Sequence, residues 1–325
     1  MKAAELLAHR QESWRELELL CVRISNTRRI NGTTTVRFAA LYRAVCADLA
    51  LADAYQLPPG TIEYLHRLVA RAHHQLYRSR SFRFREWGQL MLHEVPQRVF
   101  HDRCVQFAFV FFWSIFLLSA YLSFHSAEFP DFAENVLGEA QISQLESNFS
   151  EPLGNHSFYA RTFMASFYIY HNTGLGLKAF AMGLLIVPGL QILKFNAVHL
   201  GASFGYMARP EVAGTDHFFE FVTAHGPFEL TAIVLAAGAG LRLGLAWIWT
   251  RGYSRMESLT NTIRVAMPVM ASSMILFFLA AIIEAFISPS PLPYFVKGTI
   301  AVVSSTILVV YFVVLGYPRR DSHAV

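Results

Sequence analysis

A histidine and two glutamates lie within or beside segments that are otherwise apolar enough to lie in a membrane. His225 and Glu229 are four residues apart at the start of "HGPFELTAIVLAAGAGLRLG", and Glu284 lies near the end of a later apolar segment. Residues four apart share one face of a helix, so His225 and Glu229 can act together. An ionised carboxylate costs on the order of 2.5–3.5 kcal/mol at the centre of a bilayer, so both glutamates should face protein or water.

Other polar residues could complete this intramembrane group. Lys178 is the nearest candidate counter-charge, and four further side chains could form hydrogen bonds: His171, Asn172, Asn196 and His199. Such a group could be a buried network that locks helices together, or a site for a ligand, an ion or a metal.

The residues of this group do not favour a metal site or an enzyme. The spacing of His225 and Glu229 offers two zinc ligands, but the sequence supplies no clear third ligand. No HExxH, GxSxG or phosphate-loop pattern occurs. We therefore predict no catalytic residue, no metal and no cofactor, and prefer the structural network to the ligand site.

The elements that must hold these residues are membrane helices. The chain is 54% hydrophobic and 15% charged, and a helix needs about 20 apolar residues to cross a bilayer. The sequence predicts an all-α polytopic membrane protein with a transmembrane domain over residues 101–318. The expected spans cover residues 105–124, 228–250, 265–287 and 298–316, together with an apolar region over residues 174–207.

The charges on either side of these spans predict their orientation. Residues 1–100 are rich in arginine, whereas the loop at 125–160 carries six acids and no lysine or arginine before Arg161. The link at 251–264 and the tail with Arg319 and Arg320 are basic. Because positive charge marks the cytoplasmic side, both termini should be cytoplasmic and the acidic loop external.

This orientation requires residues 174–207 to cross an even number of times. As one straight helix the region would be about 50 Å long, which is too long for one ordinary span. Pro188 and Gly189 lie near its middle, where a helix breaks easily. We predict a broken hairpin inside the bundle that either re-enters from the outer face or spans fully.

Small residues recur every four positions in the segment after His225. They are Ala232, Ala236, Gly240 and Gly244. Such ridges allow membrane helices to approach closely. We predict that this ridge packs on another helix and supports self-association, with a dimer as the preferred form.

Three amphipathic helices are expected in the cytosolic head at 1–100. Their apolar residues recur at helical spacing, and turns at Asn31-Gly32 and Pro58-Pro59-Gly60 separate them. The segment that follows interleaves basic and aromatic residues, with Arg78, Arg80, Arg83, Arg85 and Trp87 as the expected contacts. Its position just before a span favours membrane lipid over nucleic acid as its partner.

Several stretches together resemble the stage II sporulation protein M family of bacterial integral membrane proteins. They are "LLAHRQESWRELELL", "LYRAVCADLALADAY", "YLHRLVARAHHQLY", "FYIYHNTGLGLKAFAMG" and "HGPFELTAIVLAAGAGLRLG". The chain departs from the family pattern at His171-Asn172, where a paired asparagine is expected, and at Leu7, where an aromatic is usual.

The resemblance implies a helical protein of the bacterial cytoplasmic (inner) membrane that acts as a scaffold for envelope hydrolases and is not itself the enzyme. It also implies MoxR-type ATPases or envelope hydrolases as partners. We therefore expect a non-enzymatic scaffold or assembly subunit in cell-envelope remodelling. A transporter or channel-like protein that uses the broken hairpin with Glu229 and Glu284 is the alternative, and an intramembrane hydrolase is a third.

Overall fold

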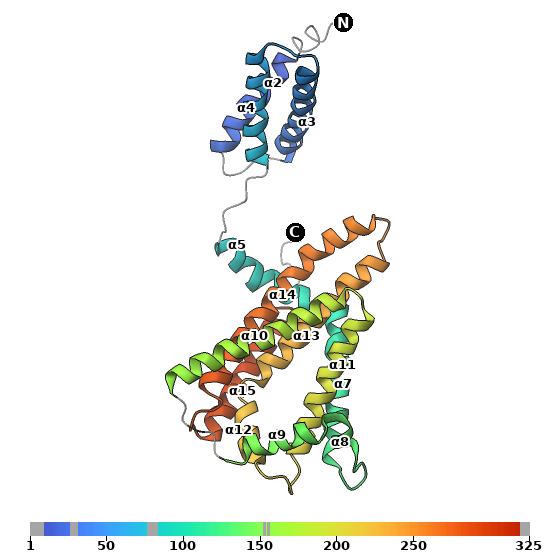
Figure 1. The fold of residues 1–325 in the computed structure, drawn as a ribbon, viewed down its shortest axis with the longest axis vertical. Coiled ribbons are helices and arrows are strands. Elements are labelled where there is room, and N and C mark those ends of the chain that lie inside the picture. Colours follow the sequence, from blue (N-terminus) through green and yellow to red (C-terminus); the bar gives the residue numbers. More distant parts are fainter. Residues whose placement is uncertain (1–9, 27–31, 77–83, 152–153, 155–156, 319–325) are drawn as a thin grey trace, which may run out of the picture. The chain divides into compact units, whose positions relative to one another are not determined.

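The computed structural model describes residues 10–26, 32–76, 84–151, 154 and 157–318, and the chain forms two compact units that divide between Arg83 and Phe84. The regular elements of these residues are helices (Figure 1). The prediction of an all-α polytopic membrane protein is confirmed.

The first unit is a three-helix head. It consists of α2 (Gln11–Asn26), α3 (Gly32–Ala54) and α4 (Pro59–Leu76). The apolar faces expected from the sequence meet in one core, in which Leu17, Val45 and Leu65 are fully buried. Burial of one such side chain stabilises a fold by about 1.5–3 kcal/mol in water, so this unit has a hydrophobic core of its own.

A buried carboxylate joins two helices of the head. The side chain of Asp48 is fully buried on α3, and it accepts hydrogen bonds from Trp14 Nε1 at 2.9 Å and from Arg10 at 2.7 Å. On the surface of the head, Arg71 pairs with Glu18 at 2.6 Å. Polar contacts thus tie α2 to both other helices.

The second unit is the membrane bundle. Its first part comprises α5 (Phe84–Gln89), the π-helix η1 (Leu90–Glu94), α6 (Val95–His101), α7 (Arg103–Phe124), α8 (Phe132–Leu137), α9 (Glu139–Phe149), α10 (Phe158–Gly183) and α11 (Val187–Met207). Then follow α12 (Thr215–Val222), α13 (Gly226–Ile248), α14 (Arg255–Phe286), α15 (Tyr294–Val309) and the π-helix η2 (Val310–Val314). Within the described residues, α7, α13, α14 and the run from α15 through η2 are long and apolar enough to cross a membrane.

Helix α13 is the most deeply buried of these four and packs against α7, α10, α11, α14 and α15. Its Ala/Gly ridge faces other parts of the same chain. A Cβ atom at Gly240 would overlap the carbonyl of Phe180 on α10, and one at Gly244 would lie 2.5 Å from the carbonyl oxygen of Gly183. Ala232 and Ala236 are fully buried. The prediction that this ridge supports self-association is therefore wrong, because the fold already covers it.

A second small-residue interface joins α7 and α11. A Cβ at Gly201 would overlap the carbonyl of Phe116, and one at Gly205 would overlap that of Ala120. Ser123 donates a hydrogen bond to the carbonyl of Ala202 at 2.8 Å across the same interface. The Gly-x-x-x-Gly spacing in "GASFG" is a signal for this contact that sequence reasoning missed.

The predicted hairpin consists of α10 and α11, and its break differs from the expected one. The turn is at 184–186, where Ile186 has a φ of 55°, and Pro188 lies in the first turn of α11. Proline is tolerated there because its missing N–H has no intrahelical partner. Gly189 instead allows close packing, because a Cβ there would lie 2.5 Å from Gly183 Cα.

The first arm of the hairpin is also longer than predicted, since α10 begins at Phe158 and not near Gly174. The loop expected at 125–160 contains the short helices α8 and α9. Polar residues such as Arg161 and Asn172 lower the hydropathy of α10, so the sequence did not predict its first half as part of the hairpin.

The basic-aromatic segment falls mostly outside the described residues, which include neither Arg78, Arg80 nor Arg83. Arg85 lies in α5, and Trp87 on the same helix is 39% exposed. The expected lipid contact of this segment stays a prediction.

Candidate functional site

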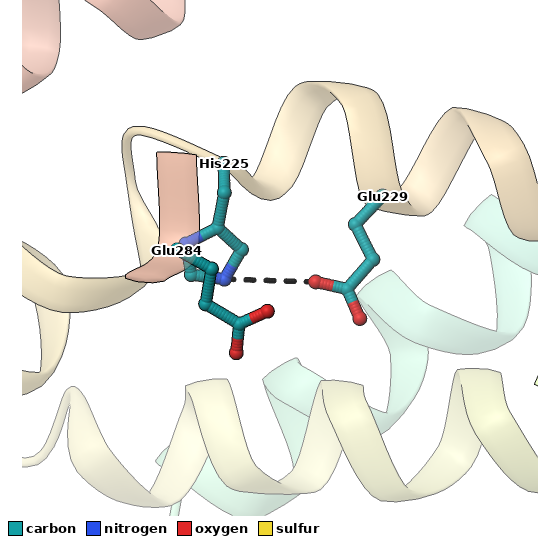
Figure 2. Close-up of side chains that lie close together, drawn as sticks. All are labelled: His225, Glu229 and Glu284. Atoms are coloured by element: carbon teal, nitrogen blue, oxygen red, sulfur yellow. Dashed lines mark ion pairs between the residues drawn. The ribbon is translucent and has the colours of Figure 1, made fainter. Parts of the chain in front are cut away.

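Three of the predicted intramembrane residues converge at one end of the bundle. His225 directly precedes α13, Glu229 lies in the first turn of that helix, and Glu284 lies in the last turn of α14. Their ligand atoms are all within 4.8 Å of one another. His225 Nε2 lies 3.5 Å from Glu229 Oε2, and the carboxylate of Glu284 points toward both (Figure 2).

Local sequence explains this placement. Pro227 occupies the first turn of α13, so the helix begins beside His225. The Nε2 of His225 reaches Glu229 one turn later because residues four apart lie on one helix face. Ser273 on α14 donates to the carbonyl of Ala232 on α13 at 2.7 Å, and this bond holds the two helices in register.

Neighbouring side chains orient these three residues. Ser288 Oγ lies 2.9 Å from Nδ1 of His225, and Asn172 Nδ2 on α10 donates to Glu284 Oε2 at 3.4 Å. His225 is 5% exposed, Glu284 is 9% exposed, and Ser288 and Asn172 are buried. The Glu229 side chain is 20% exposed, so the group is a largely buried polar cluster, which we define as His225, Glu229, Glu284, Asn172 and Ser288.

A buried lysine borders this polar cluster. Lys297 on α15 is fully buried, and its Nζ donates to the carbonyl oxygen of Ser288 at 2.9 Å. It also lies 3.9 Å from Glu220 on α12. No sequence signal pointed to Lys297, because this residue immediately precedes the expected span at 298–316 and a charge at the end of a span is common. Ser288 was missed because it lies in the link between two helices.

Lys178, predicted as the counter-charge of the glutamates, lies elsewhere. It is exposed on α10, whereas Asn172 on the same helix is buried in the polar cluster. Six residues correspond to about 600° of helical rotation at 3.6 residues per turn, so the two side chains lie on different faces. The prediction for Lys178 is wrong for this reason.

Three further predicted members also lie outside the polar cluster. His171 is exposed and stacks on Phe167 with ring centroids 5.8 Å apart. The side chains of Asn196 and His199 bond to carbonyls of their own helix, Ile192 at 2.8 Å and Phe195 at 2.9 Å. Of the hydrogen-bonding candidates, only Asn172 contacts either glutamate among the contacts of the described residues.

A cavity of about 420 Å³ reaches the polar cluster from one side. Tyr168 and Phe163 of α10, Phe221 of α12 and Glu284 of α14 contribute to its lining. Its wall is mostly apolar and aromatic, and its charged residues are Glu284 and Arg161. Such a lining, with few polar groups, is typical of sites for small molecules.

A separate ion pair lies beside the start of α7. Asp102 caps α7 by accepting a hydrogen bond from the backbone N–H of Cys104 at 2.9 Å, and it pairs with Arg242 of α13. The pairing of Arg242 with this buried carboxylate offsets the cost of placing both charges in the bundle.

Comparison with known families identifies the fold that carries the polar cluster. The model described as stage II sporulation protein M matches residues 107–289, which is more than half of the chain and includes the polar cluster apart from its border residue Lys297. A second model, described as a domain of unknown function (DUF8413), matches residues 4–78. No curated protein and no solved structure matches the chain.

Proposed function

Because the chain belongs to the stage II sporulation protein M family, we propose that it is a membrane scaffold whose bundle lies in the bilayer and whose head recruits a partner. The observation that carries this proposal is the division into two units, of which the head has its own hydrophobic core. A head with its own core does not need the bundle to bury its apolar side chains, which supports a role for its surface in binding another protein.

The surface of the head offers a docking region. Glu16 and Arg37 pair at 2.6 Å and join α2 to α3, and Leu19 and Val36 close to this pair are 65% and 71% exposed. Exposed apolar side chains can mark a protein contact site where they form a patch, and we propose that Leu19 and Val36 belong to one. By family resemblance, we propose a cytosolic ATPase of the MoxR type or an envelope hydrolase complex as the partner.

The scaffold proposal is tested by gentle extraction and cross-linking of three proteins. They are the full chain, a chain that begins at residue 84, and the double variant Leu19→Glu, Val36→Glu. We expect the full chain to co-purify with a defined partner, and both altered proteins to insert in the membrane without it. Glu63→Gln, a surface change on α4, is the control and should retain the partner. A full chain that is monomeric and without a partner would refute the proposal.

We further propose that the bundle crosses the cytoplasmic membrane six times, with both termini in the cytoplasm. At 1.5 Å per residue α10 is about 39 Å long and α11 about 31 Å, so each matches the hydrocarbon core of about 30 Å. The turn between these two helices packs beside Gly244, which lies near the end of α13 opposite to the polar cluster. These lengths favour a spanning pair over a re-entrant loop.

Labelling of single cysteines in a cysteine-free background tests this topology. Ser147→Cys should react with an impermeant maleimide in intact cells, and Tyr253→Cys should react only in inverted vesicles. The turn variant Leu185→Cys distinguishes the two hairpins. Labelling from the inner side supports two spans, whereas no labelling from either side supports re-entry.

We also propose that the chain self-associates, through a surface different from the Ala/Gly ridge. Tyr159, Phe163 and Tyr170 on α10 are 83%, 67% and 82% exposed. Aromatic residues are enriched in protein interfaces. Phe163→Cys should therefore cross-link two copies in the membrane, whereas Ala232→Cys, inside the bundle, should not. Without a cross-link at position 163, this face contacts lipid.

A second candidate function is transport through the polar cluster. The observation that favours it is the cavity of about 420 Å³ that has Glu284 in its wall. Glu284→Gln separates the two functions. Loss of solute uptake into vesicles with normal partner recruitment would favour transport, and loss of recruitment would favour the scaffold.

A further inference from the structure

We propose that His225, Glu229 and Glu284 bind one divalent transition-metal ion. One imidazole nitrogen and two carboxylate oxygens come within 4.8 Å of one another from two helices. Ligands at about 2.0–2.2 Å from a tetrahedral Zn²⁺ lie about 3.3–3.6 Å apart, so rotations of the side chains that shorten the longest separation by about 1 Å would close the site. Glu284, from a second helix, supplies the third ligand that the spacing of His225 and Glu229 within one helix does not provide.

The residues around these three resemble the supports of known metal sites. A metal-binding histidine usually bonds through its other ring nitrogen, which fixes its tautomer and its orientation. Here Ser288 Oγ lies at 2.9 Å from Nδ1 of His225, so Nε2 is left to face the carboxylates. Asn172 holds one oxygen of Glu284 in the same way and leaves the other available.

The charges of the site favour a cation. Glu229 and Glu284 place two carboxylates near one end of the bundle, where two ionised carboxylates repel each other and lose hydration. Two lysines that could neutralise them do not, because Lys178 is exposed and Lys297 pairs with Glu220. Arg161 lines the same cavity as Glu284 and is the cationic residue on that side of the site. A divalent ion would balance both carboxylates while His225 stays neutral.

The donor set indicates the class of ion. Imidazole nitrogen is a good ligand for zinc, iron and other transition ions, whereas calcium and magnesium prefer oxygen alone. Three protein ligands also leave a coordination position for water or a substrate oxygen. Because Glu284 lines the cavity of about 420 Å³, a molecule in that cavity could reach this position.

Zinc binding to the full chain tests the proposal. The detergent-solubilised protein would be stripped with EDTA, loaded with Zn²⁺, desalted and analysed for bound metal. We expect about one tightly bound Zn²⁺ per chain in the wild type, and at least a tenfold loss in Glu229→Gln and Glu284→Gln. Glu211→Gln, the same chemical change in the link between α11 and α12, is the matched control and should keep the metal.

Two additional measurements keep the test decisive if a ligand variant fails to assemble. Ser288→Ala leaves all three ligands in place and should weaken Zn²⁺ binding by about 10- to 100-fold. Replacement of Zn²⁺ by Co²⁺ should give an absorption spectrum that changes in His225→Gln. A monodisperse wild type that keeps no Zn²⁺, or equal binding in wild type and both glutamine variants, would overturn the proposal.

Discussion

The head and the membrane bundle hold their helices together in different ways. The head core is built from large side chains such as Trp14, Phe38 and Leu65, whereas the bundle, which also buries large side chains, brings backbones together at Gly183, Gly240 and similar positions. In water, burial of apolar surface drives folding, but between membrane helices this driving force is absent because lipid tails are equally apolar. In the bundle, close backbone packing and hydrogen bonds therefore supply stability that the head obtains from burial of large apolar side chains in water.

The head and the bundle also differ in the interactions that their polar groups make. The ion pairs of the head lie mostly at its surface, as between Glu18 and Arg71. In the bundle, Ser123 and Ser273 instead donate to carbonyls of neighbouring helices at 2.8 and 2.7 Å. Substitutions that add or remove one small group should therefore affect the bundle more than the surface of the head.

The largest expected effect comes from a methyl group at Gly240. Gly240→Ala would place a Cβ against the backbone of Phe180, and backbone atoms cannot move aside without shifting α10. We expect a loss of about 3 kcal/mol in unfolding free energy, the upper part of the range for overpacking. The midpoint of unfolding in SDS, with the protein in mixed micelles, measures it.

Gly174→Ala is the matched control for this change. Gly174 lies inside α10, and no neighbouring atom lies within 4 Å of the position that an added methyl group would take. Alanine is favoured over glycine in a helix by about 0.5–1 kcal/mol, so this variant should be as stable as wild type or more so. Equal destabilisation by both substitutions would contradict the close approach of α10 and α13.

The second largest effect is expected in the head, at its buried carboxylate. Asp48→Asn would weaken the bonds from Trp14 and Arg10 while it keeps the shape of the side chain. Hydrogen bonds to charged groups contribute about 1.5–3 kcal/mol, and we expect a loss in that range. Urea unfolding of residues 1–83, followed by the fluorescence of Trp14, the sole tryptophan of that fragment, measures it.

Asp53→Asn on the same helix is the comparison for this prediction. The Asp53 side chain is 51% exposed and lies 3.9 Å from His66. A surface substitution of this kind should change stability by less than about 0.5 kcal/mol. If it costs as much as Asp48→Asn, burial is not the reason for the importance of Asp48.

The sequence predicted the head better than the polar cluster because helical periodicity is a local property. Residues such as Leu41 and Leu65 recur at helical spacing, and the structure buries both. His225 and Glu229 could be paired for the same reason, since one helix holds both. Glu284 could be added because each glutamate lies at an end of an apolar segment, and the predicted orientation places both ends on the same side of the membrane.

Contacts between distant segments could not be predicted in this way. Lys178 was chosen by its charge, but the rotation of α10 directs it away from the glutamates. Ser288 meets His225, and Lys297 meets Ser288, only because the link after α14 turns back over the start of α13. Such positions depend on how the helices pack, which composition and spacing do not encode.

A smaller effect is expected from one hydroxyl group between membrane helices. Ser123→Ala removes the bond to Ala202 that joins α7 and α11. Hydrogen bonds between membrane helices contribute about 0.6 kcal/mol on average, and we expect a loss of that size in SDS unfolding. Ser166→Ala, which removes a bond within α10 to Thr162, should have no comparable effect.

The smallest expected effect is the pH dependence of a surface ion pair in the head. The hydrogen bond from Arg71 lowers the pKa of Glu18 below its usual value of 4.5. A carboxylate with a lowered pKa stabilises the folded state fully above its unfolded pKa, and this contribution is lost as the pH falls through the folded pKa. Because the pair is partly exposed, we expect only about 0.2–1 kcal/mol at neutral pH.

A double-mutant cycle isolates this contribution from the other acids of the head. Unfolding of residues 1–83 in urea would be compared for wild type, Glu18→Gln, Arg71→Gln and the double variant at pH 7 and near pH 3. The coupling energy should be positive at pH 7 and shrink in acid, since protonated Glu18 no longer attracts Arg71. A coupling that is independent of pH would mean that Tyr64, which donates to Glu18 at 3.1 Å, and local packing hold this side chain, and not its charge.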